Sequence, residues 1–150
     1  MFKHILVPTD GSEISQNAVR NAVTFAQEAN AKITAFYAKP EYPVTYYGEG
    51  VLIDTTSPER FEELAESQAQ EILGFVETLC HEVEVPCTKM SLTSDVPHEA
   101  IIKAANQCSC DLIFMASHGR KGLTSLLLGS ETQKVLTHST IPVLVYRTPE

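Results

Sequence analysis

The 150-residue chain has the length of one ordinary domain, and its 43% hydrophobic and 20% charged residues are typical of a globular fold. Its net charge of −8 and pI of about 5.1 argue against binding to nucleic acid or to an anionic membrane through bulk electrostatics. The first ten residues lack the apolar core of a signal peptide, and no apolar run is long enough to span a bilayer, so we expect a cytoplasmic protein with a single domain over residues 1–150.

Strand-like and helix-like patterns alternate from the start of the chain. Residues 5–7 predict a buried strand that enters the turn sequence Pro-Thr-Asp-Gly, and small apolar residues at helical spacing predict a helix over 12–30 with Ser12 as its N-cap. Residues 31–38 predict a second strand. The stretch 39–57 is rich in proline, glycine and tyrosine, and we predict a long irregular loop, either a lid over a ligand or partner, or a partly ordered connection.

The alternation continues through the second half of the chain. Ser57 and Pro58 are typical of the N-cap and first residue of a helix, which extends to about residue 83. Strands and helices then follow in turn over 85–93, 96–107, 111–116, 130–138 and 141–147. This order predicts an α/β fold with an open, five-stranded parallel sheet and helices on both faces.

Ligands of open parallel sheets bind beyond the carboxyl ends of the strands, where the strand order reverses. Two loops there are candidates: the one after the first strand, and residues 116–130 after the fourth. The second loop has three glycines, the cations Arg120 and Lys121, and Gly129-Ser130 at a helix start, a pattern that favours phosphate binding. In the alternative interpretation the glycines only turn the chain and Ser130 only caps the helix in a capping box with Gln133.

The segment "ASHGRKGLTSLLLGS" contains neither GxGxxG nor GxxxxGK[ST], which argues against a dinucleotide fingerprint or a Walker NTPase. Its spacing resembles the G-x2-G-x9-G-[S/T] motif in the ATP-binding branch of the universal stress protein family. Gly119, Gly129 and Ser130 match that motif, and Ala116 replaces its first glycine. The segments "ILVPTDGSEIS" and "SETQKVLTHSTIPVLVYR" also resemble the family, so the likeness covers essentially the whole chain.

The resemblance implies a Rossmann-like sheet of order 3-2-1-4-5 that binds ATP between the loops after strands 1 and 4. It implies that Asp10 lies near the ribose and supports Mg²⁺ held by the ATP phosphates, and that Ala38 offers backbone groups to adenine. His118 is either a neighbour of the phosphates or a structural loop histidine. The expected nucleotide-binding residues are Pro8, Thr9, Asp10, Ala38, Ala116, Ser117, His118, Gly119, Arg120, Gly129, Ser130, Glu131 and Thr132.

Three functions remain open at this stage. The first is an ATP-binding stress-response protein with at most slow hydrolysis, because the sequence contains no obvious catalytic base or arginine finger. The second is a nucleotide-free, homodimeric interaction module, and the third is a binder of another adenine ligand such as cyclic AMP. The resemblance also implies a homodimer paired through the last strand, from Ile141 to Tyr146. The four cysteines and five histidines lack metal-ligand spacing, and we expect free thiols.

Overall fold

The computed structural model describes residues 1–47, 50–53, 57–118 and 128–148, with residues 44–47 and 50–53 described by their backbone only. The strands are β1 (His4–Pro8), β2 (Lys32–Lys39), β3 (Val44–Tyr47), β4 (Gly50–Ile53), β5 (Cys87–Thr93), β6 (Leu112–Ala116) and β7 (Val143–Tyr146). The helices are α1 (Glu13–Ala29), α2 (Pro58–Glu82), α3 (Pro97–Gln107) and α4 (Ser130–His138).

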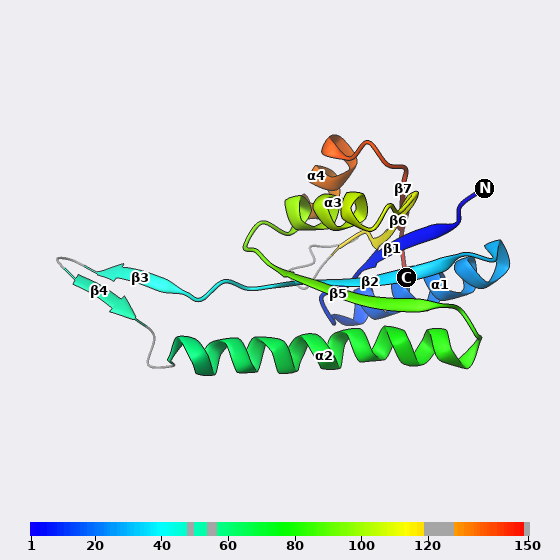
Figure 1. Ribbon diagram of the computed structural model, residues 1–150. Helices are drawn as coiled ribbons and strands as arrows, with labels where there is room; N and C mark the ends of the chain where they lie inside the picture. Colours follow the sequence, from blue (N-terminus) through cyan, green and yellow to red (C-terminus); the bar gives the residue numbers. More distant parts are fainter. Residues whose placement is uncertain (48–49, 54–56, 119–127, 149–150) are drawn as a thin grey trace.

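Five strands form one parallel sheet in the order β5-β2-β1-β6-β7, which confirms the predicted order and direction. Helices α1 and α2 cover one face of the sheet, and α3 and α4 cover the other (Figure 1). The chain builds outward from β1 to β5 on one side and then restarts with β6 on the other side of β1. The strand order therefore reverses beside β1, at the centre of the sheet.

The core consists of two apolar layers that the sheet separates. Alternate residues of β1 point into different layers: Ile5 and Val7 pack with α1 and α2, whereas Leu6 packs with α3 and α4. All three side chains are at most 1% exposed. Burial on both faces explains why the central strands consist of continuous apolar runs instead of an alternating pattern.

The prediction of an irregular loop over residues 39–57 is wrong in part. β3 and β4 pair there as an antiparallel hairpin, which Figure 1 shows extending away from the sheet. β-Branched, aromatic and aliphatic residues in both arms favour strands, although the neighbouring prolines and glycines suggested a loop. At the base of the hairpin, the ring of Tyr42 packs edge-on against Phe61 of α2, with 5.4 Å between ring centroids.

The predicted start of α4 near Ser130 is confirmed, and of three suggested N-cap residues two are confirmed and one, Ser130, is wrong. The side chains of Ser12 and Ser57 cap α1 and α2 by accepting hydrogen bonds from the third residue of each helix, as predicted. The capping box at α4 is not formed: Gly129 is the N-cap, and Ser130 is the first helical residue. The side chain of Gln133 donates to the Leu128 carbonyl at 2.8 Å and does not reach back to a capping serine.

Candidate functional site

The loop after β1 is held in place by its own polar groups. The Thr9 N–H donates to the Phe36 carbonyl at 2.9 Å, which extends the contact between β1 and β2 by one residue. The Ser12 N–H donates to Asp10 Oδ1 at 2.9 Å, and Gly11 between them has a φ of 80°, a conformation that favours glycine. The carboxylate of Asp10 is thereby fixed at the carboxyl end of the central strand.

The N-terminus of α4 is fastened to the end of β6. The Gly129 N–H donates to the Ser117 carbonyl at 2.9 Å. The buried hydroxyl of Thr132 donates towards two carbonyls, those of Ala116 at 3.1 Å and Ser117 at 3.2 Å. A Cβ atom on Gly129 would lie 3.3 Å from the Ser117 oxygen and 3.4 Å from His118 Cα, so this close approach favours glycine.

The first turn of α4 presents backbone donors to a ligand. The N–H groups of Ser130, Glu131 and Thr132 have no acceptor within the helix, and none among the other residues that the structure describes. They lie at the positive end of the helix dipole. The N–H of Gly129 is used within the protein, so the donors left for an anion are those of the three following residues.

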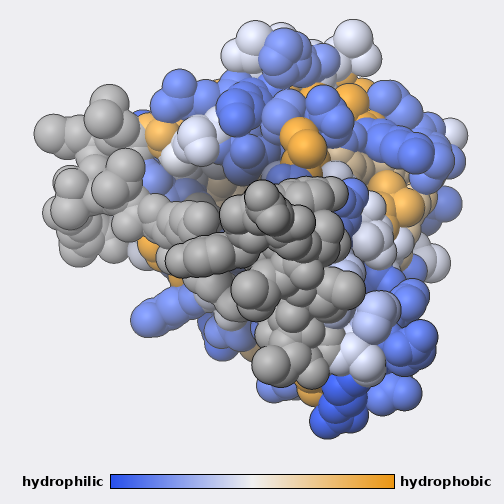
Figure 2. All heavy atoms as spheres, turned by 90° about the vertical axis from the view of Figure 1, so that its left-hand side faces the viewer, coloured by the Kyte–Doolittle hydropathy of each residue, from blue (hydrophilic) through white to orange (hydrophobic). Residues whose placement is uncertain are grey.

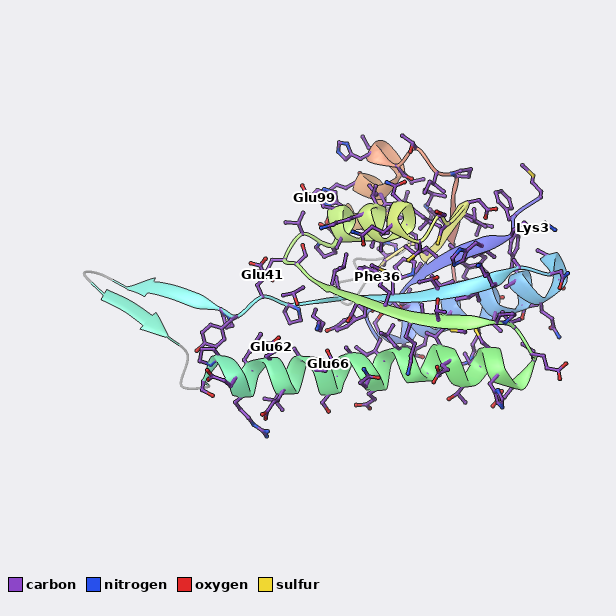
Figure 3. All side chains as sticks on the ribbon, viewed as in Figure 1. Lys3, Phe36, Glu41, Glu62, Glu66 and Glu99 are labelled. Carbon is purple, nitrogen blue, oxygen red and sulfur yellow. The ribbon has the colours of Figure 1, made fainter. Side chains whose placement is uncertain are left out.

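These loops border a cavity of about 490 Å³ at the carboxyl end of the sheet. Figure 2 looks onto this end of the molecule, where the described residues around the edge are mainly hydrophilic. Glu41 lies at the same end of the molecule (Figure 3). Its backbone N–H donates to Asp95 Oδ1 at 2.9 Å and is therefore not available to a ligand. The cavity is lined by Pro8, Thr9, Asp10, Ser15, Phe36, Tyr37, Ala38, Asp95, Pro97, Ile101, Met115, Ala116, His118, Gly129, Ser130, Glu131 and Thr132.

The backbone of β2 continues past the end of β1 and faces this cavity. The N–H and C=O groups of successive strand residues point alternately to opposite sides. Because the Phe36 carbonyl accepts from Thr9, the N–H and C=O of Ala38 point to the same side, where β1 has already ended. Ala38 therefore turns one donor and one acceptor towards the cavity. β2 ends one residue later than predicted, at Lys39.

The described lining of the cavity is acidic, with three carboxylates and no lysine or arginine. Each carboxylate accepts a backbone N–H: Asp10 that of Ser12, Asp95 that of Glu41, and Glu131 that of His98 at 2.8 Å. These hydrogen bonds hold the three carboxylates at fixed positions around the cavity.

Glu131 links the two helices on one face of the sheet. Its carboxylate accepts from the backbone N–H of His98 in the first turn of α3 and contacts His98 Nδ1 at 2.9 Å. Burial acts to raise the pKa of Glu131, but the hydrogen bonds from His98 outweigh it, and the pKa lies below its usual range. The side chain of Glu131 thus supports the helix pair, while its backbone N–H remains available to a ligand.

The structure gathers most of the predicted site residues. Ten of them line the cavity: Pro8, Thr9, Asp10, Ala38, Ala116, His118, Gly129, Ser130, Glu131 and Thr132. Ser117 does not line it; this residue is buried, and its hydroxyl contacts His118 Nδ1 at 3.1 Å. Gly119 and Arg120, together with Lys121, lie outside the described residues.

Sequence reasoning missed seven lining residues: Ser15, Phe36, Tyr37, Asp95, Pro97, Ile101 and Met115. One signal for Asp95 was available, because this residue follows the third predicted strand, and the carboxyl ends of parallel strands meet at one edge. Phe36, Ile101 and Met115 are core positions, and their apolar character alone does not distinguish them from the rest of the core.

Two kinds of feature are absent from the described part of the chain. No three residues among its histidines, cysteines, aspartates and glutamates gather as ligands of a metal ion. None of its helices is both long enough and apolar enough to cross a membrane.

A doubly wound parallel sheet with a cavity at its switch point defines an α/β protein of the Rossmann-like class. Within this class, the model of the universal stress protein family matches residues 1–147, and the chain belongs to that family. The chain is 33% identical to universal stress protein MJ0531 of Methanocaldococcus jannaschii, over 100% of this chain and 85% of the relative. It is also 33% identical to universal stress protein A homolog 1 of Coxiella burnetii, over 95% and 94% of the two chains.

Solved structures show the same fold. The structure of protein MJ0577 matches with a TM-score of 0.76 and 27% identity, over 100% of this chain and 99% of that one. A universal stress protein in complex with cAMP matches with a TM-score of 0.72 and 22% identity, over 99% of both chains. An Arabidopsis thaliana family member with AMP bound matches with a TM-score of 0.67 and 20% identity, over 98% and 92%. At these identities the last two comparisons establish the fold only.

Proposed function

We propose that this single-domain, cytoplasmic stress-response protein binds ATP in the cavity between the loops after β1 and β6. The observation that carries the proposal is the set of three backbone N–H groups at the start of α4, which border the same cavity as the backbone of Ala38. The donors suit phosphate oxygens, and a backbone donor and acceptor suit the edge of adenine. Related proteins of this fold bind cAMP and AMP, which supports an adenine ligand.

In this proposal ATP enters with Mg²⁺ on its phosphates. Asp10, Asp95 and Glu131 give the described lining a negative charge, which opposes a bare triphosphate. A phosphate-bound Mg²⁺ reduces that repulsion, and the oxygen of Asp10 is a suitable outer partner for it. Arg120 and Lys121 add two positive charges to the sequence of the loop after β6 and lie outside the described residues. We expect hydrolysis to be slow at most, because no described lining residue serves as an arginine finger.

Native mass spectrometry of the purified chain tests the identity of the ligand. The proposal predicts a co-purified mass of one ATP per chain. A co-purified cyclic AMP would support the alternative of a different adenine ligand in the same cavity. A chain that carries no nucleotide, and acquires none when ATP and Mg²⁺ are added, would support the interaction module, with the Ala116 methyl group blocking the position of the missing glycine.

Asp10→Ala tests whether this carboxylate contacts the ligand. We expect the affinity for ATP–Mg²⁺ to fall by about 1.5–3 kcal/mol, the range for a charge-assisted hydrogen bond, and the free energy of unfolding to fall by only ~1 kcal/mol because the cap on the Ser12 N–H is lost. Calorimetric titrations and thermal melts measure the two effects. Asp10→Asn is the matched control for stability, because it keeps an oxygen for Ser12. A lower melting temperature with undiminished affinity for Asp10→Ala would assign the residue to structure alone.

We further propose a homodimer that pairs through β7, one of the two edge strands of the five-stranded sheet. An apolar edge strand invites pairing with a second copy, and antiparallel pairing of two β7 strands gives a symmetric contact. Val145→Lys places a charge on this edge without altering the described core clusters, which do not include Val145. We expect this variant to be monomeric by light scattering, whereas Leu136→Lys, on the exposed surface of α4, remains dimeric. An unmutated chain that is monomeric at micromolar concentration would refute the dimer.

A further inference from the structure

Asp95 borders the cavity and is not among the groups to which the proposed function assigns a contact with ATP. It lies between β5 and α3, and its side chain is exposed. Oδ1 of Asp95 accepts the Glu41 N–H at 2.9 Å, and no other described residue donates a hydrogen bond to this carboxylate. The protein therefore holds one oxygen of Asp95 and leaves the second oxygen available to a ligand.

Two hydrogen bonds fasten the segment after β5 to the end of β2. The Ser94 N–H donates to the Lys39 carbonyl at 2.9 Å, and the Glu41 N–H donates back to Asp95. Figure 3 shows Glu41 at the cavity end of the sheet. Asp95 is thus fixed next to the stretch of β2 backbone that contains Ala38, whose N–H and C=O face the cavity.

The order of the strands places Asp95 at the base end of the proposed ligand. Neighbouring strands lie about 4.8 Å apart, so three spacings separate β5 from β6 by roughly 14 Å. The phosphate donors start α4 beside the end of β6, Asp10 follows β1, and Ala38 belongs to β2. A nucleotide that meets these groups in turn has its base nearest to β5 and to Asp95.

Apolar side chains border the same cavity and suit the faces of a base. Phe36 of β2 and Ile101 of α3 line the cavity, and both belong to the apolar layer between the sheet and α3. These side chains offer no hydrogen-bonding group to the edge of the base. Ala38 and Asp95 add polar groups that contact this edge: a backbone donor and acceptor from Ala38, and a carboxylate oxygen from Asp95.

We propose that Asp95 selects a purine with an amino group at position 6, and so favours ATP over inosine triphosphate (ITP). The inference rests on the proposed binding of a nucleotide in this cavity. The amino group of adenine has two hydrogens, and the Ala38 carbonyl accepts one while the free oxygen of Asp95 accepts the other. Hypoxanthine carries an oxygen at this position. An ionised carboxylate only accepts hydrogen bonds, so it attracts the amino group and repels the oxygen.

Calorimetric titration of ATP–Mg²⁺ and ITP–Mg²⁺ into the unmutated chain and into Asp95→Asn tests this selection. Asparagine keeps an oxygen for the Glu41 N–H and replaces the free oxygen with a donor. Water competes for the exposed side chain, so we place the contact at the weak end of the range for charged hydrogen bonds. We therefore expect the ratio of ATP affinity to ITP affinity to fall by about tenfold in Asp95→Asn.

Asp10→Asn is the matched control, because it removes a carboxylate from the same cavity at a position away from the base. We expect this variant to change the affinities for ATP and ITP by the same factor and to leave their ratio unaltered. A general effect of cavity charge on the phosphates likewise cancels in the ratio.

The outcomes separate this inference from the proposed function. An unchanged ratio in folded Asp95→Asn, or ITP binding to the unmutated chain as tight as that of ATP, overturns the selection by Asp95 while ATP binding itself stands. An unmutated chain that binds neither nucleotide overturns both the proposed function and the selection by Asp95.

Discussion

Gly129→Val lowers the affinity for ATP–Mg²⁺ by about two to four orders of magnitude. The glycine lets the chain pass close to Ser117 and His118, and a Cβ atom there would lie 3.3 Å from the Ser117 oxygen. A valine side chain forces this turn away, and the N–H groups at the start of α4 move with it. Losing two hydrogen bonds to charged phosphate oxygens, at roughly 1.5–3 kcal/mol each, gives the expected range. Calorimetric titration measures the change.

The matched control for this variant is Gly74→Val. Gly74 lies within α2, and a Cβ atom there meets nothing within 4 Å among the described residues. We expect this variant to bind as the unmutated chain does, and circular dichroism checks that both variants are folded. If folded Gly129→Val binds ATP–Mg²⁺ as tightly as the unmutated chain, the start of α4 is not the phosphate site.

Thr132→Val lowers the free energy of unfolding by about 1–3 kcal/mol, the cost of leaving buried polar groups without a partner. The Thr132 hydroxyl is the donor to the carbonyls of Ala116 and Ser117, and the side chain is only 3% exposed. Valine has nearly the same shape but no hydroxyl, so the loss reports on these hydrogen bonds and not on packing. Urea denaturation measures the free energy directly.

Thr132→Ser provides the control, because serine keeps the hydroxyl and loses only a methyl group. We expect its stability to lie well above that of the valine variant, and its affinity for ATP–Mg²⁺ to remain near that of the unmutated chain. The valine variant also loses the hydrogen bonds that hold the first turn of α4 to β6. We therefore expect its affinity for ATP–Mg²⁺ to fall together with its stability. Equal stability of the valine and serine variants would show that the hydroxyl does not fasten α4 to β6.

The sheet was predictable from the sequence because local and global signals agree. Capping serines at positions 12 and 57 mark the starts of α1 and α2, and apolar runs mark strands that are buried on both faces. Parallel strands require crossovers of one hand, and this limits the possible orders. The family resemblance selected the order that the structure adopts.

The polar details were less predictable, because they depend on contacts between distant residues. The Ser130 capping box is locally plausible, but the hydrogen bond from Gly129 to Ser117 makes the glycine the N-cap. The hydroxyl of Thr132 and the carboxylate of Glu131 reach β6 and α3, which no local pattern indicates.

The most direct measurement of the central claim is calorimetric titration of ATP–Mg²⁺ into the nucleotide-stripped, unmutated chain, with Ala116→Gly titrated beside it. Ala116 lines the cavity at the end of β6, where the family motif has a glycine. We expect saturable binding of one ATP per chain in the presence of Mg²⁺, with only a small change for Ala116→Gly. No binding by the unmutated chain, with binding regained in Ala116→Gly, would contradict it and identify a nucleotide-free interaction module.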